Sequence, residues 1–126
     1  KKEIDRVTKL TGKNTGLELN IALNYGSRDE IVHAVKEIAR EVAHGKIKTD
    51  DINEKMMIDK LYTSGVPDPD LLIRPGGEKR LSNFLLWQSA YTEFWYTDVL
   101  WPDFREEHIV EAILDYQNRN RRFGGI

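Results

Sequence analysis

The apolar positions of the chain follow two periods, and the clearer one is helical. Over residues 27–44 apolar side chains recur every three or four positions, which predicts an amphipathic helix. Ser27 and Glu30 have the spacing of a capping box at its start, and Gly45 is a natural stop at its end. The chain therefore contains at least one long helix with a face to bury.

The same pattern predicts three further helices. Residues 1–10 have apolar side chains at three-residue spacing, residues 51–61 follow an acidic cap, and the last helix is expected over residues 103–117. A short buried helix is also expected from Phe84, behind the capping-type residues Ser82 and Asn83, because the four residues 84–87 are all apolar.

The second period is that of strands. Residues 17–24 alternate strictly between apolar and polar, which predicts a strand with one buried face. Residues 71–73 and 94–97 are short runs rich in strand-forming residues. Because these strands alternate with helices, the sequence predicts an α/β fold with a largely parallel sheet flanked by helices. The length of 126 residues fits one domain over residues 1–126.

Cationic side chains gather where the run 71–73 ends. A turn of proline and two glycines follows the run, and then the short helix is expected. In α/β proteins a junction of strand, glycine turn and helix N-terminus is a common place for anionic ligands. The residues after this strand are therefore the first candidates for a binding site.

The side chains at this junction suit a diphosphate. Arg74 and Arg80 supply two guanidinium groups and Ser82 supplies a hydroxyl, while Gly76 and Gly77 let backbone amides approach an anion. The alternative is a tight turn with solvated charges, because the stretch matches neither the P-loop nor the dinucleotide fingerprint. From spacing alone both interpretations stay open.

Two further features have competing interpretations. Glu93 lies in an apolar and aromatic stretch, where a carboxylate needs a partner such as a divalent cation bound to phosphate, or else faces solvent at a helix end. The arginines at 119, 121 and 122, followed by Phe-Gly-Gly, fit a solvated helix end, a small RNA-contacting tail or an arm that reaches another active site.

Composition excludes several classes of protein. The net charge of −2 gives no support for nucleic-acid binding, and the absence of cysteine excludes disulfides and thiolate metal sites and fits a reducing compartment. No apolar run approaches the roughly 20 residues of a membrane-spanning helix. Because the chain begins at Lys1 rather than methionine, we expect a fragment or a processed product.

Several blocks of the sequence resemble one family. Residues 73–88 (IRPGGEKRLSNFLLWQ) and 90–93 (AYTE) resemble the signature of the cis-prenyltransferases, above all the bacterial undecaprenyl diphosphate synthases. Residues 24–28, 98–104 and 121–125 resemble further blocks of the family, in the same order. The resemblance extends over nearly the whole chain.

The resemblance implies a homodimeric, Mg²⁺-dependent enzyme that condenses isopentenyl diphosphate with an allylic diphosphate, expected to be farnesyl diphosphate, in making carriers of the undecaprenyl diphosphate type. It implies that Arg74, Arg80 and Ser82 grip the diphosphate of isopentenyl diphosphate and that Glu93 helps to hold the magnesium. It also implies that Arg122 and Gly124 belong to an arm that crosses the dimer and closes the partner's diphosphate site.

The resemblance also shows what this sequence lacks. Members of the family carry, in their first half, an aspartate loop central to the metal and the allylic diphosphate, and no such loop is present here. We therefore expect a C-terminal half that does not turn over alone, located in the cytoplasm or peripherally at the membrane that receives the product. The alternatives are a non-catalytic subunit or inactive fragment, and with less support an RNA-binding module.

Overall fold

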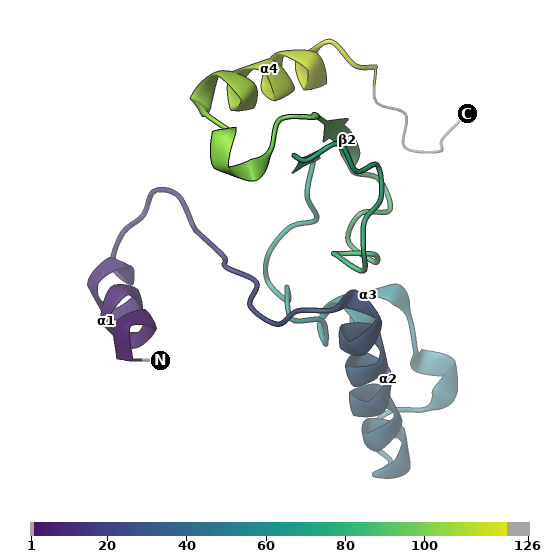
Figure 1. The fold of residues 1–126 in the computed structure, drawn as a ribbon. Coiled ribbons are helices and arrows are strands. Elements are labelled where there is room, and N and C mark those ends of the chain that lie inside the picture. Colours follow the sequence, from purple (N-terminus) through teal and green to yellow (C-terminus); the bar gives the residue numbers. More distant parts are fainter. Residues whose placement is uncertain (1, 121–126) are drawn as a thin grey trace.

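The computed structural model describes residues 2–120 and confirms the α/β class. Helices, two short 3₁₀ turns and two strands follow one another along the chain (Figure 1): α1 (Lys2–Thr11), α2 (Ser27–Ala43), η1 (Thr49–Asp51), α3 (Glu54–Ile58), β1 (Leu71–Arg74), β2 (Glu93–Tyr96), η2 (Trp101–Asp103) and α4 (Glu106–Gln117). None of the helices described is both long and apolar enough to cross a membrane.

The sheet is a parallel pair, as the sequence predicts. β1 and β2 run side by side with Leu71 opposite Glu93 and Arg74 opposite Tyr96. Helix α4 lies against β2 (Figure 1). Because the strands are parallel, Arg74 and Tyr96 end at the same edge of the sheet, and Leu71 and Glu93 begin at the other.

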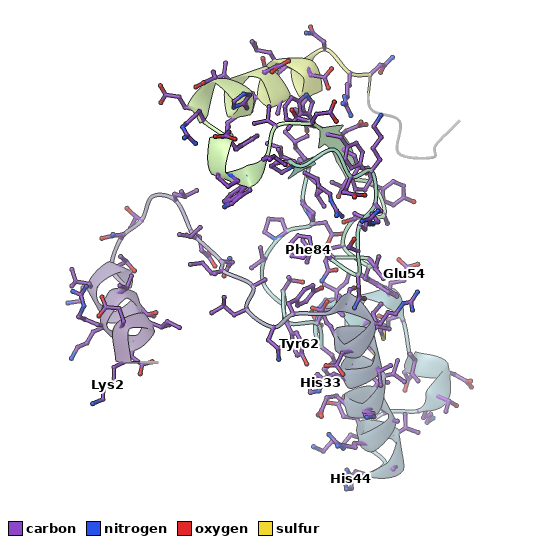
Figure 2. All side chains as sticks on the ribbon, viewed as in Figure 1. Lys2, His33, His44, Glu54, Tyr62 and Phe84 are labelled. Atoms are coloured by element: carbon purple, nitrogen blue, oxygen red, sulfur yellow. The ribbon has the colours of Figure 1, made fainter. Side chains whose placement is uncertain are left out.

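Helix α2 is the best-anchored helix. Ala34 and Ile38, one turn apart, are buried, and α3 packs against the same helix. The ring of Tyr62 lies beside His33 of α2, with ring centroids 5.4 Å apart (Figure 2). After the helix, Gly45 takes a φ of +68°, the left-handed conformation that ends helices, so the predicted stop is confirmed.

The strand predicted over residues 17–24 is wrong for the described part of the chain. The four apolar side chains that were expected to form the buried face are instead 69–92% exposed: Leu17, Leu19, Ile21 and Leu23. A strand exists only where a neighbour completes its backbone hydrogen bonds, and within residues 2–120 the sheet contains β1 and β2 only. Helix α1, confirmed where expected, also has no buried residue and lies apart from the other elements in Figure 1.

Two helix predictions need correction. The helix expected from Phe84 does not form, because Leu85 has a φ angle of +46°, which a right-handed helix cannot contain. The residues expected to cap it, Ser82 and Asn83, also have positive φ angles, of +48° and +65°. The helix expected over residues 51–61 is the shorter α3. It begins after Asn53, whose side chain accepts a hydrogen bond from the amide of Met56 at 3.1 Å.

Candidate functional site

The turn after β1 depends on its glycines for shape. Gly76 and Gly77 have φ angles of +94° and +75°, and their amides donate to the carbonyls of Val99 (2.8 Å) and Thr97 (2.9 Å). A Cβ on Gly77 would lie 3.0 Å from the Oδ1 atom of Asp98. The expectation that these two amides are free for an anion is therefore wrong, because they already fasten the turn to the segment that follows β2.

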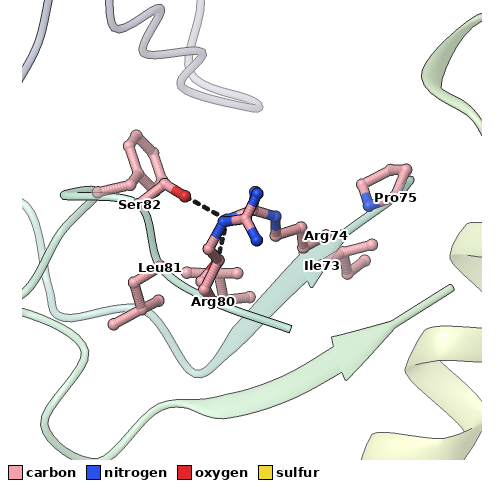
Figure 3. Close-up of a pocket in the computed structure, with 8 residues that line it drawn as sticks. Ile73, Arg74, Pro75, Arg80, Leu81 and Ser82 are labelled. Atoms are coloured by element: carbon pink, nitrogen blue, oxygen red, sulfur yellow. Dashed lines mark hydrogen bonds between the residues drawn. The ribbon is translucent and has the colours of Figure 1, made fainter. Parts of the chain in front are cut away.

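The predicted cluster of Arg74, Arg80 and Ser82 does come together (Figure 3). The Nη1 atom of Arg74 donates to the hydroxyl of Ser82 at 3.1 Å and also to the backbone carbonyl of Arg80. The guanidinium of Arg80 forms an exposed ion pair with Glu78. We call Arg74, Arg80 and Ser82 the clamp. Its position at the carboxyl edge of β1 is the one that ligands prefer in parallel sheets.

A pocket of about 300 Å³ lies at the clamp. Its lining combines the clamp with apolar side chains and one proline: Leu72, Ile73, Arg74, Pro75, Arg80, Leu81, Ser82 and Phe84. Two guanidinium groups and a hydroxyl suit an anion, and the neighbouring aliphatic and aromatic carbons suit a short apolar group. The pocket is therefore chemically matched to an amphipathic anion.

The segment after the clamp is held by the N-terminus of α2. Gly26 occupies the N-cap position and offers no side-chain cap. Instead, the amide of Ser27 donates to the carbonyl of Asn83, and the amide of Arg28 donates to Asn83 Oδ1, both at 2.8 Å. The hydroxyl of Ser27 accepts from the amide of Leu86 at 3.0 Å. Asn83 is thus a capping residue, as its type suggested, but for a helix 55 positions earlier in the chain.

Glu30 has a structural role that its spacing from Ser27 did not predict. It is fully buried, and its carboxylate accepts from the amide of Tyr62 at 2.7 Å, from the hydroxyl of Tyr25 and from the side-chain amide of Gln88 at 3.3 Å. The predicted capping box with Ser27 is therefore wrong, because Glu30 faces the interior. The available signal was its spacing, since Glu30 lies one turn before Ala34 and two before Ile38 on the buried face.

Burial also affects the phenol that contacts this carboxylate. Loss of solvent, followed by the hydrogen bond to Glu30, raises the pKa of Tyr25 above its ordinary value of 10.0. The phenol therefore keeps its proton and remains a donor to the buried carboxylate.

Glu93 lies away from the clamp. It opens β2 opposite Leu71, three positions before the level of Arg74, a separation along the ladder of about 10 Å at the rise of a parallel strand. Its Oε2 atom accepts from Nη1 of Arg119 at 2.8 Å, and Nε of Arg119 donates to Asp115 at 2.9 Å. The carboxylate predicted to hold a metal thus has a guanidinium as its partner.

The described residues do not by themselves fit Mg²⁺ at the clamp. No group of three or more histidine, aspartate or glutamate side chains within residues 2–120 could hold a metal ion. Mg²⁺ commonly takes one or two carboxylates together with phosphate oxygens and water, but Glu93 is paired with Arg119 at the other end of the ladder. A metal contact by Glu93 stays a prediction. Arg122 and Gly124 lie outside the described residues, so their assignment to a dimer arm also stays a prediction.

Sequence comparison with known proteins matches the chain to prenyltransferases. The sequence model of the Prenyltransf family, described as "Putative undecaprenyl diphosphate synthase", matches residues 1–124. The isoprenyl transferases of Heliobacterium mobile and Clostridium perfringens (strain 13 / Type A) are 62% and 60% identical over all 126 residues. The match covers 48% of the first and 50% of the second, so the chain spans about half the length of these relatives.

Solved structures agree with the sequence comparison. Lavandulyl diphosphate synthase from Lavandula x intermedia, in complex with dimethylallyl diphosphate, superposes with a TM-score of 0.94 at 42% identity. A "probable undecaprenyl diphosphate synthase" from Campylobacter jejuni gives 0.80 at 35% identity. The superpositions cover 98% of this chain in both cases, and 53% and 55% of those chains.

Proposed function

Since the chain belongs to the Prenyltransf family of undecaprenyl diphosphate synthases, we propose that it supplies the isopentenyl diphosphate site of a cis-prenyltransferase. The complete reaction joins isopentenyl diphosphate to an allylic diphosphate, with farnesyl diphosphate as the proposed primer, and yields a cis-polyprenyl diphosphate. Two diphosphates must be held in this reaction, and the clamp offers a place for one of them.

The contact that carries the proposal is the one between Arg74 and Ser82. Because the Ser82 oxygen accepts the Arg74 N–H at 3.1 Å, the proton of the hydroxyl can point elsewhere, toward a phosphate oxygen. The remaining N–H groups of Arg74 and those of the exposed Arg80 are suited to paired contacts with the same anion. The clamp thus presents donors of a kind that a diphosphate binds.

The rest of the pocket suits the hydrocarbon of the same molecule. Leu72, Leu81 and Phe84 line it beside the clamp. A volume of about 300 Å³ lies at the lower end of the range of ligand sites and fits a small substrate rather than a long prenyl chain. The proposed ligand therefore places its diphosphate on the clamp and its five-carbon group on these side chains.

In the proposed reaction the carbon–oxygen bond of the allylic diphosphate breaks, and inorganic pyrophosphate leaves with the electron pair of that bond. The π electrons of isopentenyl diphosphate form the new carbon–carbon bond, and the condensed cation then loses a proton to form the double bond of the product. The role of the clamp is to hold isopentenyl diphosphate in place and to balance the charge of its diphosphate. Mg²⁺ on Glu93, and a homodimer in which Arg122 and Gly124 close the partner's site, remain parts of the proposal that rest on the sequence resemblance.

Calorimetric titration of the chain with isopentenyl diphosphate and with inorganic pyrophosphate tests the proposal. Arg74→Ala should weaken binding of both by about 10- to 100-fold, the range for loss of a hydrogen bond to a charged group. The matched control is Arg40→Ala, which removes an exposed guanidinium paired with Glu37 on α2 and should leave binding unchanged. Equal binding by the two variants, or no binding by the unmodified chain, would contradict the proposal.

A non-catalytic subunit of such an enzyme is the second candidate. The ion pair between Arg119 and Glu93 favours it, because this pair occupies the carboxylate proposed for the metal. An assay with labelled isopentenyl diphosphate, farnesyl diphosphate and Mg²⁺ tests the second candidate. Incorporation of label into a longer diphosphate would exclude the non-catalytic subunit, whereas binding without incorporation is expected for both candidates, because a C-terminal half is not expected to turn over alone.

A further inference from the structure

We propose that Asn83 is a positioning residue for the clamp, because it fixes the backbone of Ser82 against the N-terminus of α2. Asn83 does not line the pocket and so acts through its neighbour in the chain. The inference rests on the proposed function, since it assumes that the clamp binds a diphosphate.

The turn that carries Ser82 is unfavourable by itself. Ser82, Asn83 and Leu85 all have positive φ angles, a conformation that serine and leucine rarely adopt. Asparagine tolerates it better than most residues, which makes position 83 the natural centre of the turn. A turn of this kind persists only where surrounding structure holds it.

Helix α2 provides that support through its first amides. With no cap of its own at Gly26, the helix leaves the amides of Ser27 and Arg28 to Asn83, whose carbonyl and side-chain oxygen each accept one at 2.8 Å. A helix N-terminus attracts such acceptors because its first amides lack partners within the helix. Two bonds from one rigid helix therefore fix both the backbone and the side chain of Asn83.

The far side of the turn is fastened to the same helix. The hydroxyl of Ser27 accepts from the amide of Leu86 at 3.0 Å, and the buried carboxylate of Glu30 accepts from Gln88. At Gly26 a Cβ would lie 2.9 Å from the Nδ2 atom of Asn83, so a glycine there leaves room for the amide group. The turn is thus held at both ends by the first turn of α2.

The clamp depends on this support because the hydrogen bond between Arg74 and Ser82 tolerates only small changes in distance and angle. The hydroxyl of Ser82 lies 3.1 Å from Arg74, and hydrogen bonds weaken steeply as distance and angle depart from ideal. A shift of the Ser82 backbone would separate the hydroxyl from the guanidinium. Asn83 therefore sets the geometry of a contact in which it takes no part.

Two substitutions at one position separate the cap from the backbone conformation. Asn83→Gly keeps a positive φ easy but removes the side-chain acceptor, whereas Asn83→Asp keeps an acceptor that faces the N-terminus of α2, where negative charge is favoured. We expect Asn83→Gly to weaken binding of inorganic pyrophosphate by about fivefold, as for loss of one hydrogen bond, and Asn83→Asp to restore most of the affinity at 0.15 M salt.

A double-mutant cycle with Ser82→Ala tests whether the effect passes through the hydroxyl. If Asn83 acts by positioning Ser82, Asn83→Gly should weaken binding no further once the hydroxyl is gone. A role in general stability would instead multiply the two losses. Unchanged affinity in Asn83→Gly, or multiplied losses in the double variant, overturns the inference and leaves the proposed function standing. Failure of the unmodified chain to bind pyrophosphate removes the proposed function, and the inference with it.

Gly26→Ala gives an independent route if Asn83→Gly does not fold. Its φ of −151° is open to any residue, so the added Cβ acts mainly by displacing the side-chain amide of Asn83. We expect weaker pyrophosphate binding with a normal circular dichroism spectrum, and no further loss when Gly26→Ala is combined with Ser82→Ala. Wild-type affinity in Gly26→Ala also overturns the inference.

Discussion

Arg119 holds Glu93 by a hydrogen bond of 2.8 Å from Nη1 to Oε2, which ties the segment just after α4 to the first residue of β2. Both side chains are 29% exposed. The hydrogen bonds to Glu93 and then to Asp115 raise the pKa of Arg119 above its ordinary value, so the guanidinium stays charged whenever the protein is folded. Any cation that approaches Glu93 must compete with this guanidinium.

Replacement of Arg119 should therefore expose Glu93 to metal ions. We expect Arg119→Gln to lose about 1 kcal/mol of stability, as for a partly buried ion pair, and to gain more stability on addition of Mg²⁺ than the unmodified chain gains. Thermal unfolding with and without Mg²⁺ measures both. Asp115→Asn is the control, because it leaves the bond between Arg119 and Glu93 in place. Equal responses to Mg²⁺ in all three proteins would speak against a metal contact at Glu93.

Loss of the Glu30 carboxylate should be among the most destabilising single changes. Glu30→Ala leaves the amide of Tyr62 and the side chain of Gln88 without their buried acceptor, and we expect a loss of about 3 kcal/mol in the free energy of unfolding. Glu37→Ala, on the more exposed part of the same helix, should cost less than about 0.5 kcal/mol. Urea unfolding of the two variants tests the prediction, which fails if their losses are equal.

The raised pKa of Tyr25 predicts an alkaline limit to stability. A folded-state pKa above the unfolded value of 10.0 means that the folded chain binds the phenolic proton more tightly. This contribution is fully present below pH 10 and is lost as the pH rises through the folded pKa. Tyr25→Phe should therefore show a smaller decline in stability than the unmodified chain when urea unfolding is compared at pH 9 and above. An unchanged decline would refute the link to Tyr25.

The two glycines of the turn after β1 should differ in their tolerance of a methyl group. Gly76→Ala adds a Cβ in open space and should cost about 1 kcal/mol for its positive φ. Gly77→Ala adds the same strain and a 3.0 Å contact with Asp98, so it should cost more. When Asp98→Ala is combined with Gly77→Ala, the loss of stability caused by Gly77→Ala should fall toward that of Gly76→Ala, because the contact with the Asp98 side chain is gone. Urea unfolding decides, and no difference between the two alanine variants contradicts the prediction.

The sequence was sufficient for elements that depend on their own residues. The stripe of α2 and the left-handed Gly45 after it follow from local spacing, and so do β2 and α4. The cluster of Arg74 and Ser82 was also predictable, because Arg74 ends β1 and Ser82 lies only eight positions later, in the loop that follows the strand. At these positions the residues that determine the structure are close together in the sequence, so their pattern is enough to predict it.

The failures arise where a distant segment decides the conformation. The alternation of residues 17–24 defines an apolar face but supplies no pairing partner, and within residues 2–120 β1 and β2 pair with each other rather than with this segment. Ser27 and Glu30 have the spacing of a local cap, yet they contact Leu86 and Gln88, which lie 59 and 58 positions later. The apolar run from Phe84 suggested a helix. The residues of the run do not reveal that Asn83, just before it, is hydrogen-bonded to the first amides of α2.

The close approach of Gly26 to Asn83 also constrains how relatives of this chain can vary. A larger residue at position 26 would need the space that the Asn83 amide fills, so the two positions should change together rather than one at a time. Ser27 and Arg28 offer backbone amides to Asn83, so those two bonds do not depend on their side chains. The side chain of Ser27 is constrained separately, because it is buried and its hydroxyl accepts from the amide of Leu86. An insertion between Gly26 and Ser27 would move both amides at once, so the spacing of these residues is constrained together with the small size of the residue at position 26.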